Sequence, residues 1–465
     1  MITLKRIYFI LFLIGWFFFP FNDFNGIPSL GEFKNEAGAF FFMAGFVIFC
    51  VDIFLKGKLY LPLKSRIFQV LLFFLFWCLF TTVLNIDTVY FNYFKHTGGV
   101  FRFIRQYFAL LLSALFFVIY FWNVIMNLKN FQILLKIRRM LLACLIFAFF
   151  YGFLETLIVV FNINVIRPLL DVLDYFPFLD VNYVPGERIS SIAYESPSLG
   201  NYLITISGWM FSYILTEKSK YRFVPALMVL FLTFFSGSRT ALIIITIQVC
   251  ILISVLYSTK ENREIVFDGF KYVFIFFSIL LIINGNKILK AIDDKADSLN
   301  FSGNLKTNIS NQSRFGMQYA SLQVFKEHPL IGVGFGQETY FKRFHYPAWA
   351  KKNNYEFKLL YENKNIRSFP TAYNLYTRLL AETGLIGVLI FGYLIYLCIS
   401  KSFFLWKKTE NEEKTLALIL FISFVGLSLN WLQTDFFRQY GFWLCMVILI
   451  KLLKLINDRT KTIIG

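Results

Sequence analysis

The sequence predicts an all-α polytopic membrane protein with about twelve transmembrane helices, a large extracytoplasmic loop subdomain and both termini in the cytoplasm. Of its 465 residues, 57% are hydrophobic and 16% are charged, whereas an average soluble domain has about 25% charged residues. The apolar residues form uncharged runs of about 15 to 22, close to the ~20 that a helix needs to cross a bilayer. Lysine and arginine gather in alternate loops between these runs.

The apolar runs are expected to be helices, because a helix satisfies its own backbone hydrogen bonds in lipid. The first run follows Lys5 and Arg6 and could be a signal peptide, but Phe19 and Pro20 replace the small residues of a cleavage site, which favours a retained span. The expected spans are 7–21, 37–55, 67–84, 107–125, 140–161, 199–215, 223–235, 241–257, 270–283, 385–399, 416–431 and 440–456.

The orientation follows from the loops, since cytoplasmic loops hold the excess of lysine and arginine. With the N-terminus inside, each inner segment is basic, from Lys56 and Arg66 in the first loop to Lys451 and Arg459 at the end. The outer segments hold acidic residues, among them Asp171, Asp174, Asp180 and Glu187. The net charge of +18 is therefore explained by topology, and nucleic acid is not an expected partner.

Two outer segments are too long to be simple connectors. The expected organisation is five helices in 1–161, an extracytoplasmic loop in 162–198, four helices in 199–283, a large extracytoplasmic loop in 284–384 and three helices in 385–465. Longer loops of this kind often carry function. The search for a site therefore starts at the outer face.

Three arginines lie at this outer face. Arg188 precedes a span, Arg239 stands in the short turn Ser-Gly-Ser-Arg-Thr between two apolar runs, and Arg314 belongs to the large loop. Taken singly, the first two could be interfacial arginines that reach toward water, and the third a solvated charge. Nearby Glu155 lies inside an apolar run, where a carboxylate is a functional candidate unless it forms a buried hydrogen bond.

Three segments together resemble the O-antigen ligase and polymerase family of bacterial membrane glycosyltransferases. They are Ser-Gly-Ser-Arg-Thr-Ala-Leu at 236–242, the stretch from Arg314 to Glu-His-Pro-Leu-Ile-Gly-Val-Gly-Phe-Gly at 327–336, and Tyr-Asn-Leu-Tyr-Thr-Arg-Leu-Leu-Ala-Glu-Thr-Gly at 373–384. In the last segment a helix is expected to start at Pro370 and Thr371 and to break at Gly384. On it Arg378 and Glu382 have the four-residue spacing of an ion pair.

The resemblance implies an enzyme of the inner membrane that joins oligosaccharide units carried on undecaprenyl diphosphate, in polysaccharide or lipopolysaccharide biosynthesis. Guanidinium forks suit a diphosphate leaving group, so the expected catalytic arginines are Arg188, Arg239 and Arg314. No cofactor and no metal is expected. A chain-length regulator is a candidate protein partner.

One position departs from the family pattern. Ligases have a histidine immediately before the asparagine of the third segment, and Tyr373 stands there in this chain. A neutral tyrosine is a poor base near pH 7, which favours a polymerase. Glu195 is the first candidate for the base and Glu382 the second. The expected substrate-binding residues are Tyr194, Tyr373, Asn374, Arg378 and Glu382.

Three functions stay open at this point. The first is an O-antigen polymerase of the Wzy type. The second is an O-antigen ligase or protein O-oligosaccharyltransferase, which would pass the glycan to another acceptor. The third is a polysaccharide transporter, which about twelve spans also fit, although a transporter should place its ionisable groups near the middle of the bilayer.

Overall fold

The computed structural model describes residues 3–181, 188–258 and 308–464, with short pieces between 263 and 278. The described part is helical apart from one small hairpin, β1 (Tyr93–Phe94) and β2 (Thr97–Gly98). The bundle helices are α1 (Leu4–Phe17), α2 (Ala37–Lys56), α3 (Arg66–Leu84), α5 (Gly99–Leu111), α6 (Phe117–Ile125), α7 (Asn130–Val159), α9 (Ser196–Thr216), α10 (Val224–Ser236), α11 (Arg239–Tyr257), α16 (Leu375–Lys408), α17 (Asn411–Asn430) and α18 (Tyr440–Ile464). Shorter elements are η1 (Pro28–Phe33), α4 (Ile86–Phe91), η2 (Leu112–Phe116), η3 (Asn164–Ile166), α8 (Arg167–Asp171), η4 (Val172–Tyr175) and η5 (Lys220–Phe223).

Seven helices of the described residues are long and apolar enough to cross a membrane. They are Ala37–Lys56, Arg66–Leu84, Gly99–Ile125, Asn130–Val159, Arg239–Tyr257, Leu375–Lys408 and Tyr440–Arg459. The chain is therefore a multi-pass helical membrane protein, as its composition predicts. The expected number of twelve spans stays a prediction. Helices α1 and α10 have 14 and 13 residues and are shorter than a full crossing. The run 270–283 lies mostly outside the described residues.

Several helices start elsewhere than the apolar runs do. The run expected from residue 107 begins at Gly99, and the run expected from 140 begins at Asn130. The early turns of both helices contain charged residues with partners: Arg105 pairs with Glu32 at 2.6 Å, and Arg138 pairs with Glu217 at 3.4 Å. A pattern of uncharged residues does not detect such turns.

The start expected at Pro370 and Thr371 is wrong. Helix α16 begins at Leu375, because the Asn374 side chain accepts hydrogen bonds from the backbone N–H groups of Tyr376 and Thr377, at 2.9 and 3.2 Å. An asparagine in this position ends the preceding extended segment and caps the helix. The prediction of an Arg378–Glu382 ion pair is confirmed, at 3.1 Å.

Aromatic rings fill the bundle between α1, α2, α6 and α18. The centroids of Phe42 and Phe121 lie 5.1 Å apart, and those of Trp16 and Phe42 lie 5.4 Å apart. A side chain at Gly15 would overlap the Phe42 ring, so α1 and α2 approach closely at this glycine. Many of the phenylalanines in this region therefore serve packing.

The predicted break at Gly384 is present as a kink inside α16, with φ 67° and ψ −171°. The turn around Gly332 and Gly334, which also have positive φ, packs against the kink. The N–H of Gly334 donates to the carbonyl of Glu382 at 2.9 Å, and that of Leu385 donates to Pro329 at 2.9 Å. The glycines of this turn serve close backbone packing.

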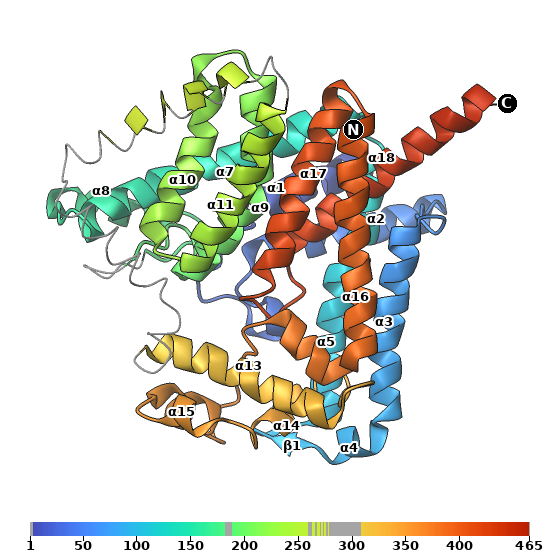
Figure 1. Ribbon diagram of the computed structural model, residues 1–465, viewed down its shortest axis with the longest axis vertical. Coiled ribbons are helices and arrows are strands. Elements are labelled where there is room, and N and C mark those ends of the chain that lie inside the picture. The colour runs from blue at the N-terminus through green and yellow to red at the C-terminus, as the bar shows by residue number, and fades with distance from the viewer. Residues whose placement is uncertain are drawn as a thin grey trace.

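The described part of the large loop forms a small helical layer: α13 (Ile309–Glu327), α14 (Glu338–Lys342), α15 (Ala348–Lys351) and η8 (Phe357–Tyr361). Met317, Tyr346 and Phe357 belong to its own apolar cluster. The layer covers the end of the bundle opposite to the start of α1 and the end of α18 (Figure 1). The two ends of the chain thus share one side of the molecule.

Candidate functional site

The three predicted arginines meet in one cavity of ≈ 450 Å³, which we call the arginine cavity. Arg188 comes from the segment before α9, Arg239 from the first turn of α11 and Arg314 from α13. None of the described residues that line the cavity is acidic. Isoleucines of α11 and Leu429 and Leu432 line it as well. The cavity thus joins positive charge to an apolar wall.

Arg188 is held in place through its neighbours. The carboxylate of Glu155 accepts hydrogen bonds from the N–H groups of Ser190 and Ser191, at 3.1 and 2.7 Å. This contact fixes the backbone just after Arg188. The arginine side chain lies against Gly237, where an added Cβ would come within 2.8 Å of it. The buried Glu155 therefore forms a structural hydrogen bond that orients the segment.

Arg239 stands where one apolar helix ends and the next begins. Gly237 ends α10 in the left-handed conformation, with φ 65°, and the Ser238 side chain caps α11 by accepting from the N–H of Ala241 at 3.4 Å. The guanidinium of Arg239 donates to Oδ1 of Asn311 at 2.9 Å. It is near enough to Arg188 and Arg314 for each of their positive charges to repel its own. An anion would relieve this repulsion.

Arg314 and Tyr373 form the wall between the arginine cavity and a second one. The guanidinium carbon of Arg314 lies 5.4 Å from the centre of the Tyr373 ring, within reach of a cation–π contact. Next to it, Asn374 lines the arginine cavity and donates to Gln318 at 3.4 Å. The predicted residues Arg314, Tyr373 and Asn374 are therefore brought together.

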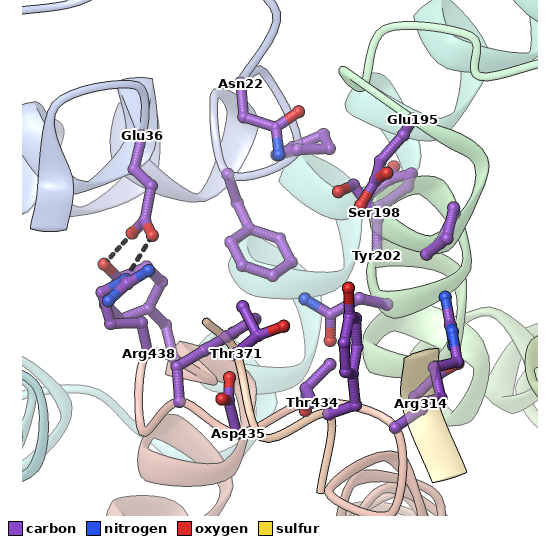
Figure 2. A pocket seen from close by; sticks show the side chains of 18 residues that line it. Asn22, Glu36, Glu195, Ser198, Tyr202, Arg314, Thr371, Thr434, Asp435 and Arg438 are labelled. Carbon is purple, nitrogen blue, oxygen red and sulfur yellow. Dashed lines mark hydrogen bonds and ion pairs between the residues drawn. The ribbon is translucent and has the colours of Figure 1, made fainter. Parts of the chain in front are cut away.

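The second cavity, of ≈ 210 Å³, contains acidic side chains, and we call it the carboxylate cavity. Figure 2 shows Glu195 and Ser198 on one wall and Thr434, Asp435 and Arg314 on the facing wall. Both cavities are lined by a shared set of four residues, namely Pro197, Arg314, Tyr373 and Gln433. A group bound in one cavity is therefore next to a group bound in the other.

Glu195 directly precedes α9 and is accessible from the carboxylate cavity. The surrounding protein raises the pKa of the Glu195 carboxyl above its ordinary value, and the positive charge of Arg314 partly offsets this by lowering it. A raised pKa makes a carboxylate a better proton acceptor. Glu195 thus lies at the carboxylate cavity with a raised carboxyl pKa, and its role as the base stays a prediction.

An ion-pair network closes the far end of the carboxylate cavity (Figure 2). Arg438 pairs with Glu36 at 2.5 Å and with Glu32 at 3.4 Å. Burial raises the pKa of Glu32, yet the charges of Arg438 and Arg105 outweigh burial and bring this pKa down to about 2. Glu32 therefore stays ionised at neutral pH, and it ties the turn after α17 to the loop between α1 and α2.

Three predicted site residues lie outside both cavities. Arg378 and Glu382 are 7% and 1% exposed and pair with each other. Arg378 also donates to the backbone carbonyl of Asp435 at 2.7 Å, so it supports the cavity wall from behind. Tyr194 is 65% exposed, and its N–H donates to Asn22 of the carboxylate cavity at 2.7 Å.

Sequence reasoning missed the residues of the turn after α17, above all Asp435 and Arg438. The carboxylate of Asp435 accepts a hydrogen bond from the N–H of Ala372, and Asp435 lines the carboxylate cavity. The polar stretch Gln-Thr-Asp between two apolar runs was a usable signal. Glu36, far away in sequence, gave no signal of its own.

The fold and the two cavities define a multi-pass membrane protein with a cluster of three arginines beside a cavity that contains carboxylates. Residues 224–392 match the model of the Wzy_C family, described as O-antigen ligase. This part of the chain is therefore similar to the O-antigen ligase family, which includes both polymerases and ligases acting on lipid-linked glycans. The matched range contains Arg239, Arg314 and Tyr373. No curated protein matches the chain.

Proposed function

We propose that the protein is a polysaccharide polymerase that joins oligosaccharide units carried on undecaprenyl diphosphate, at the outer face of the bacterial inner membrane. The observation that carries this proposal is the pair of adjoining cavities. One contains three arginines and, among the described residues, no carboxylate, and the other contains Glu195 and Asp435. Two sugar chains must meet in a polymerase, and each cavity suits one of them.

The donor binds in the arginine cavity. Its diphosphate takes the place among Arg188, Arg239 and Arg314, while the polyprenyl chain leaves along the apolar wall near Ile243 and Leu432. The N-terminus of α11, at Arg239, adds its partial positive charge. These positive groups stabilise the transition state, in which negative charge develops on the diphosphate.

The acceptor sugar binds in the carboxylate cavity. Its hydroxyl oxygen attacks the anomeric carbon of the donor, the bond from that carbon to the diphosphate oxygen breaks, and the bonding electrons remain on the diphosphate. Glu195 takes the proton of the attacking hydroxyl. Asp435 accepts a hydrogen bond from another hydroxyl of the sugar.

The alternative is a ligase, which would pass the glycan to a lipid A core or, as a protein O-oligosaccharyltransferase, to a protein. The family description favours this alternative, because it names the ligase activity. Tyr373, in the position where ligases have histidine, favours the polymerase. A transporter is disfavoured, since Arg188 lies in the segment before α9 and Arg239 in the first turn of α11, outside the middle of a span.

The experiment is deletion of the gene, followed by size analysis of the surface glycan. A polymerase deletion is expected to leave single units attached to the final acceptor, and wild-type protein should restore long chains. Bare acceptors together with lipid-linked long chains inside the cell envelope would instead identify a ligase. Lipid-linked single units confined to the cytoplasmic leaflet would identify a transporter.

A further inference from the structure

A chain of hydrogen bonds runs from the wall between the two cavities into the large-loop layer. The hydroxyl of Tyr361 donates to Oε2 of Glu356 at 2.8 Å, and the hydroxyl oxygens of Tyr361 and Tyr373 lie 2.8 Å apart. Neither Tyr361 nor Glu356 lines the arginine cavity or the carboxylate cavity. Tyr373 lines both. These hydrogen bonds therefore connect Tyr373, at the surface of both cavities, to the carboxylate of Glu356, which lines neither.

The direction of this chain follows from counting protons. Each phenol has one proton, and that of Tyr361 goes to the carboxylate of Glu356. Burial, then the neighbouring Tyr373 and Glu356, raises the pKa of Tyr361 above its ordinary value, so Tyr361 keeps this proton at neutral pH. Tyr373 must consequently donate its own proton to Tyr361. On the side that faces the two cavities, the Tyr373 hydroxyl oxygen can then only accept a hydrogen bond.

The backbone conformation at Tyr373 supports a specific role for this residue. Its φ is 57°, in the left-handed region that a tyrosine rarely adopts. Both neighbours are anchored, since Ala372 donates to Asp435 and Asn374 caps α16. Strained residues held by well-anchored neighbours are common at functional sites. In this conformation the Tyr373 ring lies within cation–π distance of Arg314, and its hydroxyl lies within hydrogen-bond distance of Tyr361.

We propose that Glu356 and Tyr361 are positioning residues that fix Tyr373 as a hydrogen-bond acceptor for a hydroxyl of the acceptor sugar. The inference rests on the proposed function and adds a requirement for the acceptor: a free hydroxyl besides the one that attacks and the one that Asp435 holds. Glu195 takes the proton of the attacking hydroxyl, and Tyr373 holds this further hydroxyl. With Tyr361 or Glu356 altered, the Tyr373 proton is free to turn into the cavity and no longer matches a donating hydroxyl.

The test uses the full-length protein in liposomes, with a labelled lipid-linked chain as donor at fixed concentration and the lipid-linked single unit varied as acceptor. Tyr361→Phe, Glu356→Gln and Tyr373→Phe are each expected to raise KM for the single unit about five- to tenfold, the effect of one hydrogen bond, with kcat changed less. The double variant Tyr361→Phe/Tyr373→Phe should be no worse than Tyr373→Phe alone, because both changes remove one interaction.

The control is Tyr346→Phe, which removes a buried hydroxyl from the same apolar cluster, one that has no hydrogen-bond partner among the residues that the structure describes. It should leave KM unchanged. An unchanged KM in Tyr361→Phe, additive losses in the double variant, or an equal loss in the control would overturn the inference. If the wild-type protein joins no units at all, the proposed function fails instead, so the two failures are distinguishable.

Discussion

Arg239 illustrates why the type of residue, and not its charge alone, matters at this site. One of its guanidinium nitrogens is used by Asn311 at 2.9 Å. A guanidinium has five donors in a fixed plane, so it can hold both the asparagine and a phosphate oxygen. A lysine ammonium on a flexible stem cannot reproduce this geometry.

We therefore expect Arg239→Lys to reduce the rate of polymerisation roughly 100-fold, the size of effect seen when one donor to a developing negative charge is lost. The measurement is the amount of lipid-linked polymer per unit of protein in membranes. Arg139→Lys serves as the control, because Arg139 is exposed on α7 and lines neither cavity. Normal chain lengths from Arg239→Lys would contradict the arginine assignment.

Glu195 and Tyr373 give the second prediction at this scale. Glu195→Gln keeps the size of the side chain and removes the base, so it should lower kcat by roughly 10² to 10⁴. Tyr373→Phe should cause a milder loss, because it removes a hydrogen bond to the sugar. Abolished polymer in Tyr373→Phe with normal polymer in Glu195→Gln would exchange the two roles.

The pH profile separates these two variants further. The base must be ionised, so the wild-type rate should fall as the pH falls through the raised pKa of Glu195. Tyr373→Phe should retain this acidic limb of the profile. In Glu195→Gln the limb should disappear along with most of the rate. An unchanged limb in Glu195→Gln would show that another group is the base.

At the scale of elements, the kink in α16 sets the direction of the helix relative to the large-loop layer. Gly384 has φ 67°, and a side chain there would overlap the carbonyl of Leu330. Gly384→Ala should destabilise the fold by more than the ~1–3 kcal/mol of a strained backbone alone. The same helix supplies the control, Gly392, where an added Cβ meets nothing within 4 Å.

The measurement is the thermal unfolding temperature in detergent. Gly384→Ala is expected to unfold at a clearly lower temperature than the wild type, and Gly392→Ala at the same or a slightly higher one, since alanine favours helix. Equal unfolding temperatures for the two variants would mean that the kink is not needed.

The sequence was informative about elements where one local signal decided the structure. The break at Gly384, the short turn at Arg239 and the Arg378–Glu382 pair all follow from residues close together in the chain. Helix starts such as Gly99 were missed, because their charged turns are satisfied by distant partners such as Glu32. Local periodicity contains no information about such contacts.

The site shows the same limit. Three arginines and Glu195 were predicted from motif and position as site residues, and the structure brings them to two adjoining cavities. Asp435 and the Tyr361–Glu356 pair were not predicted, since the contacts that bring them to the cavity wall, from Ala372 to Asp435 and between Tyr361 and Tyr373, form only in the folded chain.

At the scale of the whole molecule, both ends of the chain lie opposite to the large-loop layer (Figure 1). Together with the basic inner loops, this arrangement leads us to predict that the layer lies outside the cytoplasm. A reporter inserted at Lys351, or fused after the loop containing Lys56 or at the C-terminus, tests the orientation. The first should read extracytoplasmic and the other two cytoplasmic. A cytoplasmic signal at Lys351 would overturn the proposed site, which needs lipid-linked units at the outer face.

The most direct test of the central claim is reconstitution of the purified protein in liposomes with undecaprenyl diphosphate-linked single units as the sole substrate. The account predicts lipid-linked chains of increasing length, with one undecaprenyl diphosphate released for each new glycosidic bond, and their loss in Arg239→Lys. Units that stay single until a lipid A core or a protein is added, and are then transferred to it, would contradict a polymerase and identify a ligase or an O-oligosaccharyltransferase.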